Sequence, residues 1–408
     1  MPYHCAMTLT LKDIEAAASR ISSATINTRF EKSRTLSAMA GTELYLKFEN
    51  LQFTASFKDR GALNKLLILQ QQGEVKGVIA MSAGNHAKAV AYHSQRLGIP
   101  ATIVMPINTP NVKVEDTKSF GARVILNGDT LDEAANHARQ IAEEENLVFV
   151  HPYNDLDIIA GQGTVALEML EVAPDLDCIV VPIGGGGLVA GVATAAKAIN
   201  PKIKIIGVEV EAYPSAHNAL NGIQSSKGGS TIAEGIAVKQ PGDLNLEIIR
   251  RLVDDILIVS EESIEEAINM FLSIEKTVTE GAGAAPLSAV LSNPEIFRGM
   301  KTALILSGAN IDSRILASVL MRRLVSKGRI VRFLVEIDDS PGTLSDVSEA
   351  IGKFGGNILD VSHQRMFASV PIKKAELYLT VETRDAAQNL EILARLKELG
   401  YNAELLKE

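Results

Sequence analysis

Two short segments of the sequence carry residue types that can do covalent chemistry and hold an anion. Lys58 lies in the run SFKDRG, between an aromatic residue and a glycine. Most lysines are solvated surface charges, but a lysine amine in an apolar pocket loses its proton and attacks carbonyl compounds. Far along the chain, four consecutive glycines, Gly184–Gly187, precede Leu188. Backbone N–H groups left bare by glycine at a helix start form a cradle for an anion such as phosphate.

Together, a nucleophilic lysine and a phosphate cradle indicate pyridoxal phosphate as a cofactor. A glycine run by itself is almost equally well explained by a tight turn between a strand and a helix. The usual nucleotide fingerprints are absent, because no Gly-Lys-Ser/Thr follows the glycines and their spacing is not that of a dinucleotide loop. The sequence therefore favours a phosphorylated cofactor other than a nucleotide.

Two further segments, SAGNH and SGAN, begin at Ser82 and Ser307 and fit the same site. Asn85 offers an amide to a ring oxygen, and Ser82 with the loop amides up to His86 can hold a substrate carboxylate. Ser307 offers a hydroxyl to the pyridine nitrogen, which leaves that nitrogen close to neutral and the ring a weaker electron sink. A weaker sink disfavours transamination and suits loss of a β-substituent. Each residue also has a plainer explanation, as a helix-start residue or, for His86, as packing.

Short apolar runs that alternate with helical periodicity predict the elements that position these segments. The runs lie at residues 44–48, 78–81, 102–105, 123–126, 148–150, 179–183, 205–210, 256–259 and 303–306. Strands separated by helices imply βαβ units and a parallel sheet, in which ligands collect at the carboxyl ends of strands. All four segments follow such a run, so we expect them at one edge of the sheet.

The fold class predicted for residues 1–326 is α/β, a parallel-sheet catalytic unit of two lobes that share a cleft. Residues 131–145 are typical of its amphipathic helices. The core-facing residues expected there are Ala134, Ala135, Ala138 and Ile141. The pattern changes after a linker at residues 327–329. Residues 330–408 predict the order β-α-β-β-α-β, a small α+β ferredoxin-like domain.

Composition excludes several classes of partner. The chain has 408 residues and a net charge of −9, which argues against nucleic acid or an anionic membrane. An RNA-binding function for residues 330–408 is set aside, because this segment has 13 acidic residues against 9 basic ones. Cys5 and Cys178 are the only cysteines, and a reducing cytoplasm fits best. No secretory signal is found, and residues 178–196 are interpreted as strand, glycine turn and helix rather than a membrane span.

In this order, the four segments resemble those of the threonine ammonia-lyases, or threonine dehydratases, which are tryptophan-synthase-β-like pyridoxal-phosphate enzymes of fold type II. The resemblance covers about residues 8–325. It implies that Lys58 is the catalytic Schiff-base lysine, with Phe57 beside the cofactor ring. Asn85 would contact the ring hydroxyl oxygen, and Ser307 the pyridine nitrogen. The implied phosphate loop is Gly184, Gly185, Gly186, Gly187 and Leu188. The implied substrate loop is Ser82, Ala83, Gly84, Asn85 and His86.

Residues 330–408 resemble an ACT domain, a regulatory module that binds small molecules. The resemblance implies Asp339 and Gly342, in the first strand-to-helix loop, as effector residues. The effector would be an amino acid or a nucleotide. Such modules pair side by side, so a homo-oligomer is expected, either a dimer or a tetramer.

One position departs from the related serine racemases, which carry a serine that serves as an acid at the position of Ala83. Alanine cannot move a proton, so racemisation should be weak and β-elimination the main outcome. Those relatives also bind a divalent cation near a glutamate that aligns with Glu209. Ser215 stands where their second acid would be, so no metal is assigned.

The expected function is therefore β-elimination of L-threonine to 2-oxobutyrate and ammonia, and of L-serine to pyruvate, with allosteric control. The reaction would serve isoleucine biosynthesis or threonine catabolism. Alternatives with related chemistry are a serine or 3-hydroxyaspartate dehydratase and a serine racemase. A non-catalytic amino-acid sensor is a further alternative, and the intact Lys58, Asn85 and Ser307 count against it.

Overall fold

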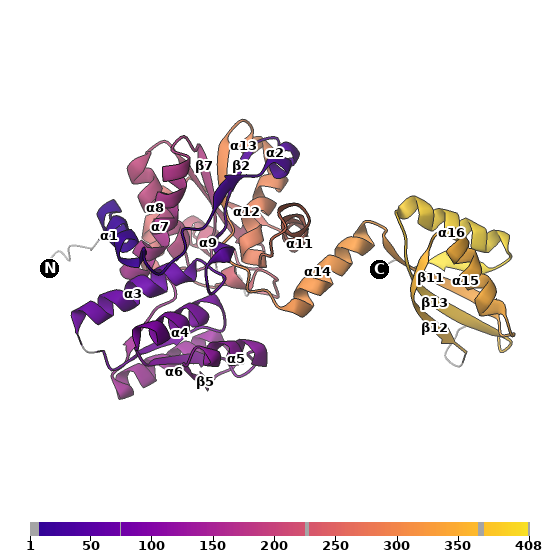
Figure 1. Ribbon diagram of the computed structural model, residues 1–408, viewed down its shortest axis with the longest axis horizontal. Coiled ribbons are helices and arrows are strands. Elements are labelled where there is room, and N and C mark those ends of the chain that lie inside the picture. The colour runs from indigo at the N-terminus through magenta and orange to yellow at the C-terminus, as the bar shows by residue number, and fades with distance from the viewer. Residues whose placement is uncertain (1–7, 74, 225–227, 366–370, 407–408) are drawn as a thin grey trace. The chain divides into compact units, whose positions relative to one another are not determined.

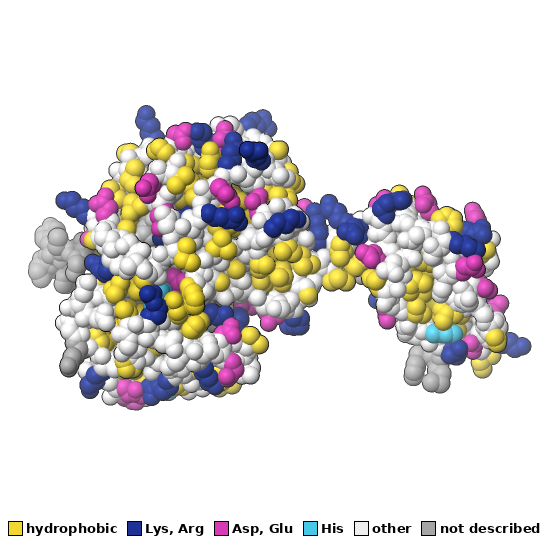
Figure 2. Space-filling view, viewed as in Figure 1, with side chains coloured by type: hydrophobic (Ala, Val, Ile, Leu, Met, Phe, Trp, Pro, Cys, Tyr) yellow, Lys and Arg dark blue, Asp and Glu magenta, His cyan; other side chains and the backbone are white. Residues whose placement is uncertain are grey.

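The computed structural model describes residues 8–73, 75–224, 228–365 and 371–406. The chain divides into two compact units, Met1–Ile311 and Asp312–Glu408 (Figure 1). This division falls earlier than the predicted linker at residues 327–329, which stays a prediction. Acidic and basic side chains are interspersed over the visible face of each unit (Figure 2). Within the described residues, no helix has the length and apolar character needed to cross a membrane.

A six-stranded sheet forms the centre of the larger lobe of the first unit, with the strand order β1-β2-β10-β7-β8-β9. All neighbouring strands are parallel except β1 and β2. The strands are β1 (Phe30–Lys32), β2 (Glu43–Lys47), β7 (Cys178–Pro182), β8 (Lys204–Val210), β9 (Asp255–Val259) and β10 (Lys301–Ile305). Every residue of β7 is buried, as expected for a parallel strand covered on both faces. The predicted parallel α/β sheet is confirmed.

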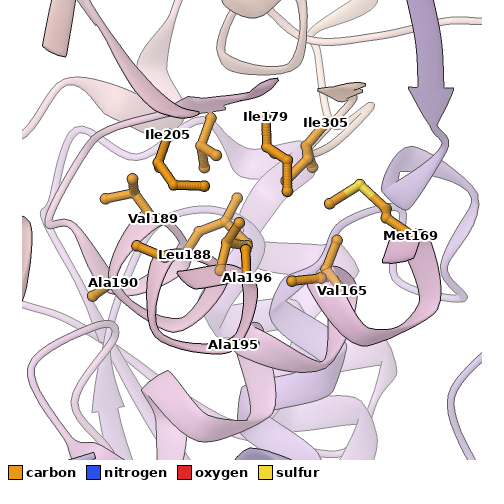
Figure 3. Packing of buried hydrophobic residues seen from close by; sticks show 14 of the residues in the cluster. Val165, Met169, Ile179, Leu188, Val189, Ala190, Ala195, Ala196, Ile205 and Ile305 are labelled. Atoms are coloured by element: carbon orange, nitrogen blue, oxygen red, sulfur yellow. The ribbon is translucent and has the colours of Figure 1, made fainter. Parts of the chain in front are cut away.

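Helices precede, connect or follow these strands in the chain. They are α1 (Leu11–Ile21), α2 (Arg34–Ala40), α3 (Lys58–Gln72), α7 (Leu156–Val172), α8 (Gly187–Ile199), α9 (Ser215–Asn221), α10 (Asp243–Leu252), α11 (Glu261–Met270), α12 (Gly281–Ser292) and α13 (Pro294–Phe297). Shorter turns are η1 (Glu49–Leu51), η2 (Glu234–Ile236) and the π-helical η3 (Phe271–Glu275). In the main core, Val165 and Met169 of α7 and Val189 of α8 gather with Ile179 and Ile305 of the strands (Figure 3). Helix α12 contacts β7, β8, β9 and β10.

The smaller lobe is a four-stranded parallel sheet of order β5-β4-β3-β6. Its elements are β3 (Val78–Met81), β4 (Ala101–Met105), β5 (Arg123–Leu126), β6 (Val148–Phe149), α4 (Asn85–Leu97), α5 (Asn111–Ser119) and α6 (Leu131–Glu145). Successive strand residues face opposite ways, so Ile79 and Val104 pack on α6 while Ala80 and Ile103 join a core with α3 and α4. The buried residues of α6 are those predicted from its periodicity, namely Ala134, Ala135, Ala138 and Ile141.

Helices α3 and α7 approach one another closely where Gly61 meets Gly161. A Cβ atom on Gly161 would lie 2.6 Å from the Cα of Gly61 and 2.8 Å from the carbonyl oxygen of Arg60. The N–H of Gly61 donates to Oε1 of Gln162 at 3.2 Å. The first turn of α3, which begins with Lys58, is therefore fixed against α7 by backbone contact.

The second unit contains a four-stranded antiparallel sheet of order β12-β13-β11-β14. Its elements are α14 (Ser313–Ser326), β11 (Ile330–Asp338), α15 (Thr343–Lys353), β12 (Asn357–Gln364), β13 (Lys374–Glu382), α16 (Ala386–Glu398) and β14 (Asn402–Leu405). Phe333 and Leu379 of the sheet share a core with Ile351 and Ile392 of the helices. The order β-α-β-β-α-β predicted for residues 330–408 is confirmed.

We expect Gly161→Ala to destabilise the first unit by about 1–3 kcal/mol, because the added methyl group meets backbone atoms that cannot rotate away. Urea unfolding measures this difference. A matched control is Gly229→Ala, whose added Cβ would lie 3.6 Å from its nearest neighbour, Ala212 Cβ. This control should change the free energy of unfolding by less than about 1 kcal/mol. Equal losses in both variants would mean that the α3–α7 crossing tolerates a methyl group.

Candidate active site

The four predicted segments meet between two sheets rather than at one edge of a single sheet. Three of them follow β2, β7 and β10 of the six-stranded sheet, and SAGNH follows β3 of the four-stranded sheet. Side chains of the two lobes bond directly to one another, because Asn85 Nδ2 donates to Glu280 and Asn85 Oδ1 accepts from Asn310. The site thus lies between the two lobes, at the carboxyl ends of parallel strands, and is called the cleft below.

Lys58 opens α3 and is partly buried. Its Nζ donates to the carbonyl oxygen of Pro152 at 2.6 Å and lies 5.2 Å from the centre of the Phe57 ring. Burial lowers the pKa of Lys58 to about 8, and the charge of Glu280 opposes this shift only in part. An amine of lowered pKa is what the sequence analysis expects of a nucleophilic lysine at this position, and that role of Lys58 stays a prediction.

Ser307 is buried at the end of β10 and is tied to the segment that carries Lys58. Its carbonyl oxygen accepts from the N–H of Phe57 at 3.0 Å, and Ser56 forms an isolated bridge with Gly308. The hydroxyl of Ser56 is buried with no hydrogen-bond partner. The structure therefore brings Ser307 and Lys58 into one site, although 249 residues separate them in the chain.

A tight turn after β6 supplies the carbonyl oxygen that holds Lys58. Nδ1 of His151 accepts from the N–H groups of Tyr153 at 3.3 Å and Asn154 at 2.9 Å. Burial, together with the nearby charge of Lys58, lowers the pKa of His151 to about 4. A neutral His151 is the form whose Nδ1 can accept both bonds, so its side chain fixes the turn that presents Pro152.

Asn85 lies at the centre of a chain of polar contacts that crosses the cleft. Its Nδ2 donates to Glu280 Oε1 at 2.7 Å, and its Oδ1 accepts from Asn310 Nδ2 at 2.7 Å. Asn310 in turn accepts from Lys88 Nζ at 3.1 Å, and Lys88 pairs with Asp116 at 2.8 Å. These contacts fix the orientation of the Asn85 amide.

The glycine loop, Gly184–Gly187, forms the turn between β7 and α8. Gly186 has a φ of +92°, a left-handed conformation that favours glycine. A Cβ on Gly185 would overlap the ring of Tyr153. Because the first N–H groups of a helix have no partner within it, this turn places amide donors at the start of α8, beside the ring of Tyr153. The side chain of Leu188 is buried in the core, so only its backbone can serve the loop.

The substrate loop predicted from Ser82 to His86 leads into α4. Ser82 Oγ accepts from the N–H of Gly84 at 3.2 Å, so it closes the turn before the helix, and Gly84 occupies the cap position. Ala83 is partly exposed. His86 is buried, and its Nε2 contacts the carbonyl oxygen of Val150 at 3.0 Å. Burial lowers the pKa of His86 to about 3, so His86 is neutral and its ring is engaged in packing.

Glu209 caps a helix in this structure. Its carboxylate accepts from the N–H groups of Ala216 at 2.8 Å and His217 at 2.9 Å, in the first turn of α9. Burial raises the pKa of Glu209 to about 7. Ser215 Oγ donates to the carbonyl oxygen of Val238. Over the described ranges, no group of three histidine, cysteine, aspartate or glutamate side chains is arranged to hold a metal ion.

In the second unit, the two predicted effector residues lie in the loop between β11 and α15. Asp339 Oδ1 accepts from Arg365 Nε at 2.9 Å. Gly342 has a φ of +95° and forms the cap of α15. The loop is exposed, and its first helical N–H groups are open to a ligand.

Sequence reasoning missed three residues of the site, namely Glu280, His151 and Tyr153. Glu280 is 8% exposed, and burial raises its pKa to about 7. One signal could have found it, because Glu280 is a single acidic residue before the small-residue, apolar helix α12. His151 and Tyr153 lie in a turn after the short strand β6, where the sequence carries no motif.

Comparison with known proteins identifies both parts of the chain. Residues 21–308 match the family of pyridoxal-phosphate dependent enzymes, and residues 330–401 match the ACT domain. An L-threonine ammonia-lyase of Thermotoga maritima is 43% identical over 400 residues, covering 98% of this chain and 100% of that protein. An L-threonine ammonia-lyase of Geobacter sulfurreducens is 43% identical over 396 residues, covering 97% of this chain and 98% of that protein.

Solved structures agree with this result. A threonine deaminase of Solanum lycopersicum, isoform 2 in its processed form, is 35% identical with a TM-score of 0.72, covering 76% of this chain and 86% of that chain. A maize serine racemase is 36% identical with a TM-score of 0.72, covering 78% of this chain and 99% of that chain. Fold and site together define a cofactor-dependent enzyme of the α/β class. The chain belongs to the family of pyridoxal-phosphate dependent enzymes and ends in an ACT domain.

The residues of the cleft fit this cofactor. A Cβ at any of the four glycines would lie within 3.1 Å of neighbouring atoms, so only glycine lets the backbone at the start of α8 take this position, and amides at a helix start are the donors that a phosphate requires. Lys58 provides a buried amine of lowered pKa, as attachment to an aldehyde requires. The unpartnered hydroxyl of Ser56 is a further buried donor beside Gly308.

Glu280 predicts a pH dependence of stability. Burial raises its pKa to about 7 in the folded protein, from an ordinary value of 4.5. The folded state therefore keeps a proton that the unfolded chain releases, so this contribution to stability is complete below about pH 4.5 and is lost as the pH rises through about 7. In the cofactor-free protein, the free energy of unfolding of Glu280→Gln should rise by about 1–3 kcal/mol relative to that of the native sequence as the pH goes from 5 to 8.

Urea unfolding of both proteins at several pH values measures this gain. Glu247→Gln is a matched control, because Glu247 lies exposed on α10. If the native protein and Glu280→Gln lose stability in parallel as the pH rises, Glu280 does not carry the buried proton.

Proposed function

We propose that this protein is a threonine ammonia-lyase, which converts L-threonine to 2-oxobutyrate and ammonia and L-serine to pyruvate and ammonia. The observation that carries the proposal is the partly buried Lys58 amine, of lowered pKa, in a cleft with Asn85, Ser307 and the glycine loop. Similarity to L-threonine ammonia-lyases over 98% of the chain supports the substrate.

The roles of the cleft residues follow from their chemistry. Amides of the glycine loop and of Leu188 would hold the cofactor phosphate at the start of α8. Lys58 would hold the cofactor carbon covalently, Phe57 would lie beside the ring, and Asn85 would donate to the ring oxygen. Bound pyridoxal phosphate supplies an electron sink for the negative charge that develops at the substrate α-carbon.

Lys58 is the group that moves the α-proton. A pKa of about 8 leaves part of the amine neutral at neutral and mildly alkaline pH, and Nζ can then take the proton from the substrate α-carbon. The carbonyl oxygen of Pro152, 2.6 Å away, accepts a hydrogen bond from Nζ and holds it in place. A base with a pKa near the working pH suits this transfer.

Ser307 favours elimination over transamination. Its hydroxyl is neutral, so the ring nitrogen it contacts would stay close to neutral and the electron sink would be moderate. The β-hydroxyl of the substrate would then leave as water, which takes up overall the proton removed from the α-carbon. The start of α4, with Ser82 and the neighbouring amides, would hold the substrate carboxylate.

Serine racemisation is the second candidate activity, since a maize serine racemase is 36% identical to this chain. A racemase needs a second proton carrier on the other face of the substrate. The loop before α4 has Ala83 at the position where the resemblance to serine racemases implies such a carrier, and its methyl group holds no proton. Elimination is therefore the main expected reaction.

Incubation of the purified protein with L-threonine should release 2-oxobutyrate and ammonia in equal amounts. Lys58→Ala should lose nearly all turnover, because it removes the amine that holds the cofactor and takes the proton. After borohydride reduction, peptide mass spectrometry should find one pyridoxyl phosphate group on Lys58 and none in the variant. Lys65→Ala, further along α3 at a lysine paired with Asp155, is the control and should keep both properties. Full turnover by Lys58→Ala contradicts the proposed site.

Ala83→Ser should increase D-serine formation from L-serine, relative to pyruvate formation, by about tenfold or more, since it adds a proton carrier to the substrate loop. Chiral chromatography measures the two products. Ala83→Gly changes the size of the side chain without adding a hydroxyl and should leave the product ratio unchanged. Equal product ratios for the serine and glycine variants would count against this role for position 83.

The second unit is proposed to control the first as part of a homo-oligomer. Its edge strand β12 pairs with β13 alone in the described sheet, and Leu359 on it is 49% exposed. Unpaired strand edges with apolar side chains favour pairing with a second copy. An amino acid or nucleotide bound near Asp339 and Gly342 at such a seam would bias the arrangement of the subunits. A coupling of this kind is typically about 1–3 kcal/mol.

Removal of residues 330–408 should preserve elimination but abolish any change of rate with isoleucine, valine or AMP, and it should reduce the size of the oligomer. Steady-state kinetics and analytical ultracentrifugation measure these effects. The intact chain with Asp339→Asn is a milder variant and should weaken the response while keeping the oligomer. A truncated enzyme that still responds to the same compounds places the effector site outside the ACT domain.

A further inference from the structure

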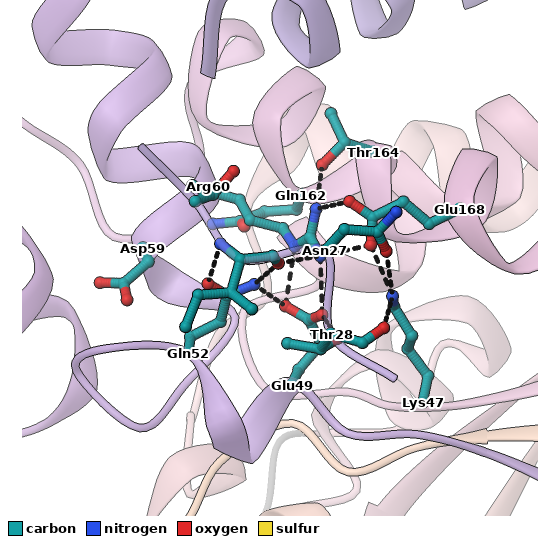
Figure 4. A network of polar contacts seen from close by, with 12 residues as sticks. Asn27, Thr28, Lys47, Glu49, Gln52, Asp59, Arg60, Gln162, Thr164 and Glu168 are labelled. Atoms are coloured by element: carbon teal, nitrogen blue, oxygen red, sulfur yellow. Dashed lines mark hydrogen bonds and ion pairs between the residues drawn. The ribbon is translucent and has the colours of Figure 1, made fainter. Parts of the chain in front are cut away.

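Four charged side chains form a buried group around Arg60, which follows the candidate nucleophile by two residues in α3. This group, called here the charge cluster, consists of Lys47, Glu49, Arg60 and Glu168 (Figure 4). The side chains of Lys47, Glu49 and Arg60 are at most 1% exposed, and that of Glu168 is 19% exposed. The mechanism proposed above does not use any of them.

Arg60 occupies the centre of the charge cluster and uses its whole guanidinium group. Nε and Nη2 donate to the two oxygens of Glu49 at 2.7 and 2.8 Å. Nη1 and Nη2 donate to the two oxygens of Glu168, both at 2.7 Å. Nη1 also donates to Thr164 Oγ1 at 3.0 Å. Nη2 also has a longer contact with the carbonyl oxygen of Ile26 at 3.4 Å, so each nitrogen of the guanidinium group has an acceptor in a fixed geometry.

Lys47 completes the charge balance. Its Nζ lies 2.5 Å from Glu168 Oε2 and 2.7 Å from the carbonyl oxygen of Thr28. Two positive and two negative side chains therefore cancel inside the protein. Although burial opposes ionisation of Glu49, the charge of Arg60 lowers the pKa of Glu49, so the pair is ionised. Separation of one partner from the others would leave an uncompensated buried charge. Because that is costly, the four side chains stay in one arrangement.

The charge cluster joins the elements that hold both ends of the Lys58 hydrogen bond. Arg60 lies in the first turn of α3, two residues after Lys58. Glu168 lies on α7, which begins four residues after Pro152, the acceptor of that bond. Glu49 ties the same guanidinium to η1, at the end of β2. A rotation or slide of α3 against α7 would therefore break these ion pairs and, at the same time, move Lys58 Nζ away from the carbonyl oxygen of Pro152.

We propose that Arg60 is a positioning residue, which sets the place of the Lys58 amine in the cleft by fixing the first turn of α3 against η1 and α7. This inference rests on the role proposed above for Lys58. A lysine at position 60 would keep the positive charge, but its single ammonium group cannot bond both carboxylates in the planar fork geometry. The charge would stay and the fixed geometry would be lost.

The test uses the full-length enzyme carrying pyridoxal phosphate and the variants Arg60→Lys and Glu168→Gln. Arg60→Lys should lower kcat about ten- to hundredfold with KM changed less than about threefold, because a misplaced reacting group costs rate rather than ground-state binding. It should also shift the midpoint of the pH titration of the visible cofactor absorption and speed cofactor loss on dialysis. A purely structural role would lower the unfolding temperature and leave the pH midpoint unchanged.

Glu168→Gln decides the question if Arg60→Lys does not fold, since Glu168 is partly solvated and its replacement keeps the side-chain shape. Glu168→Gln should change kcat, the pH midpoint and cofactor retention in the same directions as Arg60→Lys, but by smaller amounts. Lys197→Gln is the control, because Lys197 pairs with Asp254 at the end of α8 opposite the glycine loop. It should leave kcat, the pH midpoint and cofactor retention unchanged.

The outcomes separate this inference from the proposed function. If the native enzyme has no lyase activity but Arg60→Lys still shifts the pH midpoint and cofactor retention, the positioning role stands and the substrate assignment fails. If Lys58→Ala abolishes covalent cofactor attachment while the folded Arg60→Lys and Glu168→Gln match the native enzyme in every readout, the positioning role is wrong. A pH midpoint shifted equally by Lys197→Gln also overturns it, because the effect would then be general.

Discussion

Helices α3 and α7 cross so closely that only glycine fits where they touch, and the geometry of the cleft depends on this crossing. Gly161 leaves no room for a Cβ between it and the backbone of residues 60 and 61. The Lys58 amine projects from one of these helices, and the carbonyl oxygen it contacts lies just before the other. The ion pairs of Arg60 join the same two helices. Steric contact and charge pairing therefore both fix the distance between α3 and α7.

The lobes are joined across the cleft by side chains, whereas each sheet is held by its own backbone. Asn85 bonds to Glu280, Lys88 to Asn310, and Lys113 pairs with Glu234 at 2.5 Å. Each of these contacts places a residue of the smaller lobe against a loop of the larger one. Such contacts open at less cost than a strand pair, so they can adjust to a bound molecule while the backbone contact between α3 and α7 keeps its geometry.

The fold and the motif-bearing residues could be predicted because they depend on local patterns. Apolar runs marked the strands, and the periodicity of residues 131–145 marked the buried face of α6. The segments around Lys58 and the glycine loop have compositions that a packing role alone does not require. Glu280 and His151 could not be found in this way, since a single glutamate or histidine has meaning only beside its spatial neighbours. The expectation of one sheet edge was wrong for the same reason, because strand runs do not reveal which sheet a strand joins.

The strand order of the larger lobe has a consequence for how the chain can fold as it is synthesised. Strand β10, at Lys301–Ile305, inserts between β2 and β7, which are made much earlier. On the ribosome, β2 and β7 therefore lack the strand that lies between them until β10 has been synthesised. The strands of the smaller lobe, by contrast, all lie within residues 78–149 and can pair soon after synthesis. The nascent chain therefore exposes the unpaired backbone edges of β2 and β7 for a long interval, and unpaired edges of this kind are prone to aggregation until β10 pairs with them.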